Sequence, residues 1–577
     1  MILHTSDVIE APRKRFAPWL VEPMLRNKST YWKVALAAVF INLFALVTAL
    51  FTLTVYDRVI PNNAVSSLVA LSIGFGVIIV FDFILKMLRS YFVDFAGARI
   101  DQDVGESVFK QLLAIRLDLK KGSTGGLAAM LRELEALRDF FASATITAIV
   151  DVPFIILTLA VIAIIGGPVV FVPLVLVPMV ILVGWSTHPA LDRLSARSMS
   201  EGLIKQSVLV ETIGGLETVK TSGAGNLLSA RWSDAVKHHS DISLRQRLIG
   251  SIGITFATSA GTLSYAGIVI VGVFLIIDNQ MTLGALMACS ILGGRAIAPL
   301  AQIATLLSRL TLTRTAYRQI RDMMDLAPEG PEGEALQLTN PRGHIEFRNV
   351  SFRYPGAPER TLDRISFSIR PGEKVALLGK VGSGKSTVAR LALGLYPPEE
   401  GVVLIDGLDM RQLDPHSLRR NMGATLQESV LLTGSVRENI ELGREGVDEE
   451  ELLRVGELSG THDFIGHIAN GYDLKLADRG EGLSGGQRQS ISLARALATS
   501  PKMLVMDEPS SAMDAQTEAM LIERLKSELE DRTFMIITHR PPLLQLVDRI
   551  ILIDRGRITM DGPRQDVLEA LMKPKAA

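Results

Sequence analysis

Residues 379–386 read Gly-Lys-Val-Gly-Ser-Gly-Lys-Ser and follow the apolar run Val375-Ala376-Leu377-Leu378. A strand-like run followed by a glycine-rich loop ending in Lys-Ser satisfies GxxxxGK[ST], the pattern of a phosphate-binding loop (P-loop). Its glycines let backbone N–H groups point at phosphate oxygens, and the next helix presents its positive end. We expect Lys385 at the β- and γ-phosphates and the Ser386 hydroxyl on Mg²⁺. The predicted nucleotide-binding residues of this loop are Gly379, Gly382, Ser383, Gly384, Lys385, Ser386 and Thr387.

A second motif places two acids at the end of an apolar strand. Residues 503–508 read Met-Leu-Val-Met-Asp-Glu, as expected where a buried parallel strand delivers carboxylates to a phosphate site. A solvated strand end is the alternative, which the upstream P-loop disfavours. We assign Asp507 to Mg²⁺ and Glu508 to the attacking water, which it orients and deprotonates.

A third motif, Leu483-Ser484-Gly485-Gly486-Gln487, identifies the family. With the P-loop and the paired acids, it makes residues 342–577 resemble the nucleotide-binding domain of ATP-binding cassette (ABC) proteins. The resemblance implies ATP and Mg²⁺ as ligands and hydrolysis as the reaction. It also implies adenine stacking by Tyr354, γ-phosphate contact by His539, a catalytic and Mg²⁺-binding role for Gln427, and a place at a dimer seam for Asp514.

This signature motif also predicts a second copy of the chain. In the family, Ser484, Gly485, Gly486 and Gln487 cap the γ-phosphate bound to the opposite cassette, because a helix N-terminus is an anion site. One chain holds one P-loop and one signature motif, so two chains are needed to close two sites. We expect a homodimer, with a heterodimer of related halves as the alternative.

The part of the chain before this domain is rich in long apolar runs. The 577 residues are 48% hydrophobic, carry a net charge of -1 and hold one cysteine, Cys289, so no nucleic-acid partner and no intrachain disulfide are expected. A membrane span needs about 20 apolar residues to cross a core of about 30 Å. Six segments fit, at roughly 33–55, 65–87, 143–165, 168–187, 252–277 and 282–306.

Basic residues set the orientation of these spans. They gather before span one and at the end of span two, whereas the predicted outer turns hold only Arg58 as a base. The positive-inside rule then places both termini of this multi-pass membrane protein in the cytosol.

Two connections between the spans are long. Segments 99–138 and 191–247 have a helical apolar period, so we expect helices that continue beyond the bilayer and bend near residues 122–126 and 214–225. Flexible cytosolic loops are the alternative.

Few ionisable residues fall inside the spans. Of Asp82, Asp151 and Arg295, the arginine lies nearest mid-membrane. A charge there costs about 2.5 to 3.5 kcal/mol on insertion scales, so it avoids lipid. Either Arg295 lines a polar pathway or it pairs with a span carboxylate and holds helices together.

The membrane half narrows the resemblance. Residues 55–62 (Val-Tyr-Asp-Arg-Val-Ile-Pro-Asn), 81–85 (Phe-Asp-Phe-Ile-Leu) and 211–220 (Glu-Thr-Ile-Gly-Gly-Leu-Glu-Thr-Val-Lys) are similar to the ATPases of bacterial type I secretion systems that translocate haemolysin-type (RTX) toxins. That resemblance implies a polypeptide cargo (a toxin, adhesin or protease), a periplasmic adapter, an outer-membrane channel and membrane lipid as partners. Because segment 1–31 is short and lacks cysteine, no leader-peptide cleavage is expected.

These observations predict a multi-domain membrane protein: a six-helix all-α transmembrane domain followed by an α/β P-loop domain. The expected division is a cytosolic segment 1–31, a transmembrane domain 32–325, a linker 326–341 and the nucleotide domain 342–577. Export of lipid or small amphipathic molecules is the main alternative function. A soluble cassette ATPase acting on DNA or ribosomes conflicts with the six spans, and importers normally keep their membrane subunits on separate chains.

Overall fold

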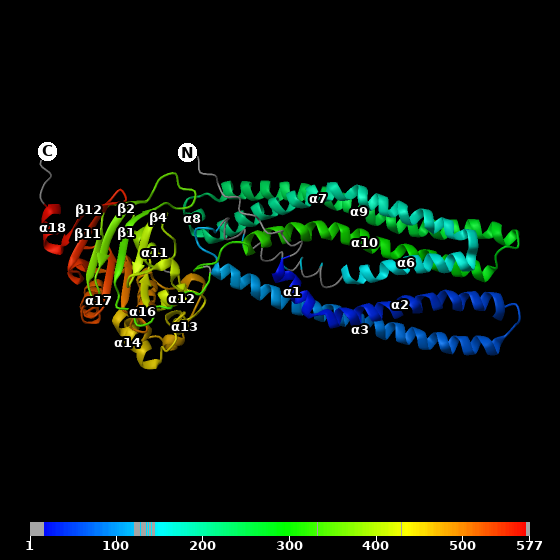
Figure 1. The fold of residues 1–577 in the computed structure, drawn as a ribbon, viewed down its shortest axis with the longest axis horizontal. Coiled ribbons are helices and arrows are strands. Elements are labelled where there is room, and N and C mark those ends of the chain that lie inside the picture. Colours follow the sequence, from blue (N-terminus) through cyan, green and yellow to red (C-terminus); the bar gives the residue numbers. More distant parts are fainter. Residues whose placement is uncertain are drawn as a thin grey trace. The chain divides into compact units, whose positions relative to one another are not determined.

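The computed structural model describes residues 17–572, except 121–126, 128–133, 135–136, 138–139, 141–144, 332 and 429. Contacts divide the chain into two compact units. The first comprises Met1–Leu113 and Lys121–Leu326, and the second comprises Ala114–Lys120 and Ala327–Ala577. Figure 1 labels the elements of both.

The described elements of the first unit are helices. They are α1 (Pro18–Arg26), α2 (Lys28–Thr54), the π-helical turn η1 (Val55–Val59), α3 (Val65–Ala114), α6 (Thr145–Gly166), the 3-10 turn η3 (Gly167–Val170), α7 (Phe171–Gly214), α8 (Leu216–Thr221), α9 (Gly225–Ile277) and α10 (Leu283–Met324).

These helices cover the predicted spans. Spans one and two lie in α2 and α3, spans four to six lie in α7, α9 and α10, and α6 holds the described part of span three. Because η3 joins α6 directly to α7, the described residues form five continuous helical stretches long and apolar enough to cross a membrane, where the sequence predicts six segments. Helix α7 continues through Pro173 and Pro178, as a packed membrane helix can.

The predicted helical extensions are confirmed where the structure describes them. Helix α3 runs on to Ala114, α7 ends at Gly214, the exposed α8 follows, and α9 begins at Gly225. The second predicted bend therefore lies where the glycines indicate, while the first, at residues 122–126, lies outside the described residues.

Close packing in this unit depends on small residues. Helices α7, α9 and α10 run side by side in Figure 1. A Cβ on Gly293 of α10 would come within 2.3 Å of Ile268 Cδ1, and one on Gly272 of α9 within 2.4 Å of Leu286 Cδ1. These glycines let the two helices approach closely, as in other membrane helix pairs. At the turn before α10, Asp57 accepts hydrogen bonds from the Thr282 hydroxyl (2.6 Å) and the Gly284 N–H (2.9 Å).

The second unit is built on two main sheets. The four-stranded antiparallel sheet has the order β2-β1-β4-β5, and the six-stranded sheet has the order β12-β11-β3-β10-β9-β6. In the larger sheet, β11, β3, β10, β9 and β6 are parallel and β12 is an antiparallel edge. The strands are β1 (Ile345–Phe352), β2 (Leu362–Ile369), β3 (Lys374–Leu378), β4 (Glu400–Ile405), β5 (Leu408–Asp409), β6 (Met422–Thr425), β7 (Gly434–Ser435), β8 (Lys475–Leu476), β9 (Met503–Asp507), β10 (Thr533–Ile537), β11 (Arg549–Asp554) and β12 (Arg557–Pro563).

Helices accompany these sheets. They are α11 (Lys385–Ala392), α12 (Pro415–Arg420), α13 (Val436–Glu441), α14 (Glu449–Ser459), α15 (Thr461–Ile465), α16 (Gly485–Leu497), α17 (Ala515–Glu528) and α18 (Arg564–Met572), with 3-10 turns η4 (Met410–Gln412), η5 (Gly471–Asp473), η6 (Asp478–Gly480) and η7 (Pro541–Leu546). The buried run of β9 and β10 explains why these strands read as uninterrupted apolar sequence: every residue of both is buried.

Part of the predicted linker packs against the second unit. Leu338 is buried in its core, and the Asn421 side chain donates to the Leu338 carbonyl at 2.9 Å. The Glu329 carboxylate forms an ion pair with the Arg419 guanidinium at 2.7 Å, and the Glu329 N–H donates a hydrogen bond to the Ala114 carbonyl at 2.6 Å. The chain after α3 is therefore fastened, through the linker, to the residues that lead into β6.

Candidate functional site

The predicted catalytic motifs follow four neighbouring parallel strands. The P-loop follows β3, Asp507 ends β9, His539 comes two residues after β10, and Gln427 comes two residues after β6. Because the carboxyl ends of parallel strands meet at one edge of a sheet, this topology brings motifs from distant parts of the sequence to the same edge.

Glycine is required in the P-loop by space as well as by backbone angle. Gly379 has φ +151°, and a Cβ there would lie 2.1 Å from the carbonyl oxygen of Ile553. Gly384 has φ +103°, and its Cβ would lie 2.6 Å from Leu362 Cδ2. The loop can thus hold its curl only without side chains at these positions, and α11 begins directly after it.

Lys385 is buried at the start of α11. Its Nζ donates hydrogen bonds to the carbonyls of Gly379 (2.8 Å) and Lys380 (2.9 Å), so the ammonium lies within the P-loop. Burial lowers the pKa of Lys385, and the nearby carboxylates of Asp507 and Glu508 oppose this shift. Inside the loop this ammonium is bound to neutral carbonyls. A bound phosphate would place negative charge directly beside it.

The paired acids are held away from water. Burial raises the pKa of Asp507, against a hydrogen bond from the Ser386 side chain, and burial also raises the pKa of Glu508. The structure thus brings the two predicted Mg²⁺ ligands Ser386 and Asp507 into contact. Glu508 Oε1 is buried without a hydrogen-bond partner among the described residues. A carboxylate oxygen without a hydrogen-bond partner can accept a proton from water.

The third predicted metal ligand and the predicted histidine differ in position. His539 Nε2 lies 4.0 Å from Glu508 Oε1, and its side chain is half-exposed. Gln427 is exposed in the bend after β6 and makes no hydrogen bond to the described residues. His539 is therefore beside the acids, whereas no hydrogen bond among the described residues joins Gln427 to them.

Tyr354 lies beside the P-loop helix. Its hydroxyl is 3.2 Å from the Thr387 hydroxyl and accepts a hydrogen bond from Arg390 at 2.8 Å. Its ring meets those of Phe352 and Tyr396 edge-on, at centroid distances of 4.9 and 5.5 Å. Tyr354, the predicted adenine-stacking residue, is thus held beside the P-loop by side chains that belong to none of the sequence motifs, apart from Thr387.

The signature motif forms the N-terminus of α16. Ser484 is the N-cap: its Oγ accepts from the Gln487 N–H (3.2 Å), and Gln487 Oε1 accepts from the Ser484 N–H (2.9 Å). No hydrogen bond or ion pair among the described residues joins this motif to the P-loop of the same chain. Asp514 caps α17 by accepting from the Thr517 N–H at 2.8 Å.

Two residues that sequence reasoning missed connect these motifs. Gln489 of α16 bonds to the Glu508 carbonyl, and Arg540 bonds to the Ser511 and Met513 carbonyls. Gln489 lies two residues beyond the signature motif and Arg540 directly after His539, so adjacency to a motif was the only available signal.

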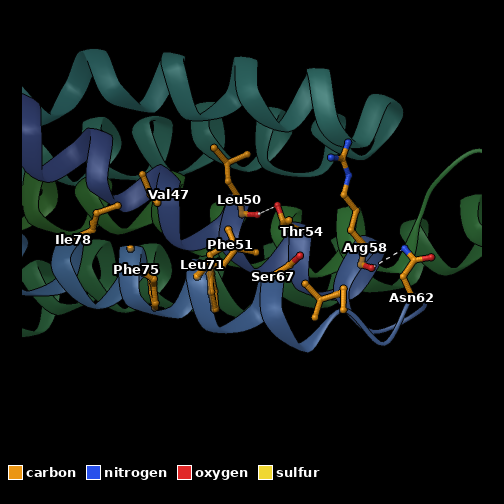
Figure 2. A pocket seen from close by; sticks show the side chains of 14 residues that line it. Val47, Leu50, Phe51, Thr54, Arg58, Asn62, Ser67, Leu71, Phe75 and Ile78 are labelled. Atoms are coloured by element: carbon orange, nitrogen blue, oxygen red, sulfur yellow. Dashed lines mark hydrogen bonds between the residues drawn. The ribbon is translucent and has the colours of Figure 1, made fainter.

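Two of the cavities among the described helices of the first unit adjoin both α2 and α3. Figure 2 shows one of about 770 Å³ between α2 and α3, lined mainly by apolar side chains such as Leu50, Phe51 and Phe75. The other, of about 250 Å³, is polar and is lined from α2, α3, α6 and α10. Its charged and amide-bearing residues are Asn42, Asp82, Lys86, Asp151, Arg295 and Gln302.

Both span carboxylates at the polar cavity have partners other than Arg295. Lys86 pairs with Asp82 at 2.6 Å, while Asp151 accepts from the Asn42 amide at 2.8 Å and lies 4.0 Å from Arg89. Asp82 also lies within electrostatic range of Arg295, so lining a polar space and pairing with a span carboxylate both fit these contacts.

Comparison with protein families matches both halves. Residues 362–511 match the family described as "ABC transporter", and residues 31–293 match "ABC transporter transmembrane region". A bacterial Atm1-family ABC exporter with ATP bound has the same fold, with a TM-score of 0.82 at 23% identity over 97% of this chain and 99% of that one. The predicted fold class is thereby confirmed.

Relatives extend the match along the chain. A leukotoxin translocation ATP-binding protein of a Pasteurella haemolytica-like species (strain 5943B) is 32% identical over 96% of this chain and 78% of its own length. The toxin RTX-I translocation ATP-binding protein of Actinobacillus pleuropneumoniae is 31% identical over 95% and 78%. A leukotoxin translocation ATP-binding protein of Mannheimia haemolytica is 31% identical over 99% and 81%.

We expect Glu508→Gln to reduce ATP turnover by about 10²- to 10⁴-fold while ATP binding is retained, because the amide fills the same space but cannot accept a proton. Steady-state hydrolysis and equilibrium nucleotide binding of the purified protein measure the two effects. Glu523→Gln, which changes an exposed glutamate of α17, is the matched control. Unchanged turnover in the Glu508 variant would place water activation elsewhere.

We expect Lys385→Ala to weaken ATP binding by about 10- to 100-fold, because a charge-assisted contact to phosphate is lost. A fluorescent ATP analogue titrated against the purified variant measures the loss. Lys502→Ala removes an exposed lysine and serves as the control. Retained tight binding would contradict the phosphate role of Lys385.

Proposed function

The chain belongs to the ABC transporter family, as a multi-pass inner-membrane ATP hydrolase coupled to transport, and we propose that it exports a polypeptide as the ABC component of a type I secretion system. The observation that carries this proposal is the likeness to toxin translocation proteins over 95–99% of the chain. A cassette alone would match any ABC ATPase, so likeness across the membrane half is what favours polypeptide cargo.

Export of lipid or small amphipathic molecules is the second candidate. The specific observation in its favour is the fold, which an exporter of another branch shares. The apolar cavity between α2 and α3 would also suit an acyl chain. The fold is common to many cargoes, however, and therefore does not decide between them.

The proposed hydrolysis assigns one task to each residue of the sheet edge. The P-loop amides from Gly379 to Thr387 and the Lys385 ammonium bind the phosphates, and Tyr354 stacks on adenine. Glu508 takes a proton from the attacking water, a role that its buried, unpartnered oxygen suits. His539, next to that carboxylate, contacts the γ-phosphate, and Gln427 joins the site from its exposed loop.

Ser386, Asp507 and Gln427 are the proposed Mg²⁺ ligands. The fit rests on the donor set, because the Ser386 hydroxyl, the Asp507 carboxylate to which it is hydrogen-bonded, and the Gln427 amide are the hard oxygen ligands that Mg²⁺ prefers. Bound with ATP, the ion would neutralise charge that develops on the phosphates.

The proposed assembly is a homodimer. Among the described residues, no hydrogen bond or ion pair joins the signature motif to its own P-loop, so the motif can serve another chain, where Ser484, Gly485, Gly486 and Gln487 cap the γ-phosphate. Asp514, exposed at the start of α17, lies at the proposed seam. Binding of ATP closes the pair, and hydrolysis reopens it, because ADP and phosphate repel one another.

The proposed setting has both termini in the cytosol, as the distribution of basic residues indicates. The partners are a periplasmic adapter, an outer-membrane channel, the secreted polypeptide and membrane lipid. On this view the polar cavity around Arg295 belongs to the cargo path. Its lining carries two acids and two bases, which balance one another and suit uncharged amide groups better than an anionic headgroup.

We expect pull-down of the intact membrane assembly to recover an adapter protein and a secreted polypeptide together with the chain. ATP hydrolysis stimulated by that polypeptide in proteoliposomes would support the proposal further. Stimulation by lipid alone, with no polypeptide or adapter recovered, would favour the second candidate.

We expect Arg295→Ala to reduce export several-fold more than basal ATP hydrolysis, because the side chain lines the polar cavity and lies outside the ATP-binding unit. Secretion assays and hydrolysis by the purified protein measure the two effects. Arg295→Lys keeps the charge, and Arg247→Ala removes an exposed arginine of α9 outside the cavity. Equal loss of both activities with lower thermal stability would instead support a helix-pairing role.

A further inference from the structure

The backbone of Glu508 is held in an unusual conformation. Its φ is +53°, in the left-handed region that residues with a side chain rarely adopt. Such a residue keeps this conformation only when its surroundings over-determine it. The chain turns at Glu508, directly after β9 ends. The direction of the Glu508 carboxylate therefore depends on the contacts that fix the backbone at this residue.

Three hydrogen bonds hold the backbone of this residue, one at its N–H and two at its carbonyl. The Glu508 N–H donates to the Ile537 carbonyl of β10 at 2.8 Å. The Glu508 carbonyl accepts from the Gln489 side-chain amide at 2.6 Å, and from the Ser511 N–H at 3.2 Å. The bond to Ile537 belongs to the sheet, and the bond from Ser511 belongs to the local turn. The bond from Gln489 is the one that reaches Glu508 from the signature helix α16.

Gln489 is itself fixed. It is buried, with 8% of its surface exposed, and every amide atom has a partner. Its Oε1 accepts from the Ala512 N–H at 3.0 Å, and its Nε2 also donates to the Ser511 hydroxyl at 3.2 Å. Because one partner is a backbone N–H and the other a carbonyl, only one orientation of the amide satisfies both.

The turn after Glu508 is held from a second side as well. Arg540 donates to the carbonyls of Ser511 (3.1 Å) and Met513 (3.1 Å) and pairs with the buried Glu518 at 3.2 Å. This arginine directly follows His539, so the turn is fastened to the histidine loop on one side and to α16 on the other. The Ser511–Met513 segment therefore has little freedom to move independently of Glu508.

We propose that Gln489 is a positioning residue that holds the Glu508 backbone in its left-handed conformation and ties the catalytic carboxylate to the signature helix α16. Gln489 acts through the backbone of Glu508, whose carbonyl accepts its amide N–H. In the proposed dimer, Ser484 at the start of the same helix serves the other site. A shift of α16 on closure would then reach the base of the chain's own site through one amide.

Gln489→Glu tests the role with the same side-chain shape. The carboxylate can still accept from Ala512 but cannot donate to the Glu508 carbonyl, which it repels. We expect kcat to fall at least about tenfold, with ATP affinity within about twofold of the parent, because only the base is displaced. Gln489→Met, which fills the volume and makes neither bond, is expected to do the same. Gln516→Glu, at an exposed position of α17, is the control.

The measurements use the full chain in detergent, with turnover expressed per nucleotide-binding site counted by titration. A purely structural role would reduce the number of binding sites and the melting temperature but leave turnover per site unchanged, and that result would overturn the proposal. If both Gln489 variants fail to bind nucleotide at all, Gln489 is needed for folding and the proposal is also overturned.

A double variant separates action through Glu508 from any other route. In the Glu508→Gln background, adding Gln489→Glu should not lower the residual turnover further, because the base is already absent. A full additional loss of tenfold would show that Gln489 acts elsewhere. These measurements concern Glu508 and Gln489 of one chain, so their outcome does not depend on the proposed dimer. The proposed dimer is tested separately, by measuring the size of the particle that hydrolyses ATP.

Discussion

The ATP-binding half depends on keeping two adjacent carboxylates dry at the end of β9. Burial raises the pKa of both Asp507 and Glu508, and the nearby Lys385 ammonium, which is hydrogen-bonded to P-loop carbonyls, offsets this shift only in part. Burying charged groups without full compensation is costly. This edge of the sheet therefore favours a ligand that brings a cation to the two carboxylates and anionic oxygens to Lys385. The sheet provides the rigidity: every residue of β9 and β10 is buried, and the P-loop curls where no side chain can fit.

In the membrane half, long helices must pack against one another without a hydrophobic driving force between them. Glycines at the contact of α9 and α10 and the carboxylate of Asp57 at the outer turn supply close contact and polar bonds. The segment after α3 is bound to Glu329, which pairs with Arg419 at the end of α12.

Much of this arrangement could be predicted from the sequence. The P-loop, the acids after an apolar strand and the signature motif each require residue types at fixed spacing, so their order was sufficient for the fold class and the family. Helical extensions and the bend near Gly214 followed from periodicity and glycine. The sequence divides spans three and four near residues 166–167, whereas in the structure the 3-10 turn η3 joins α6 directly to α7. Gln489 and Arg540 could not be found, since their roles arise from three-dimensional contacts to backbone atoms, which no spacing rule encodes.

The central claim is that each hydrolysis site is completed by a second chain. The most direct test mixes two inactive variants, Lys385→Ala and Ser484→Arg, under conditions that exchange subunits. A mixed dimer contains one site with both defects and one site with none, so the account predicts hydrolysis well above the sum of the separate variants. A mixture that remains at that sum, while the exchange of subunits is demonstrated, would contradict it.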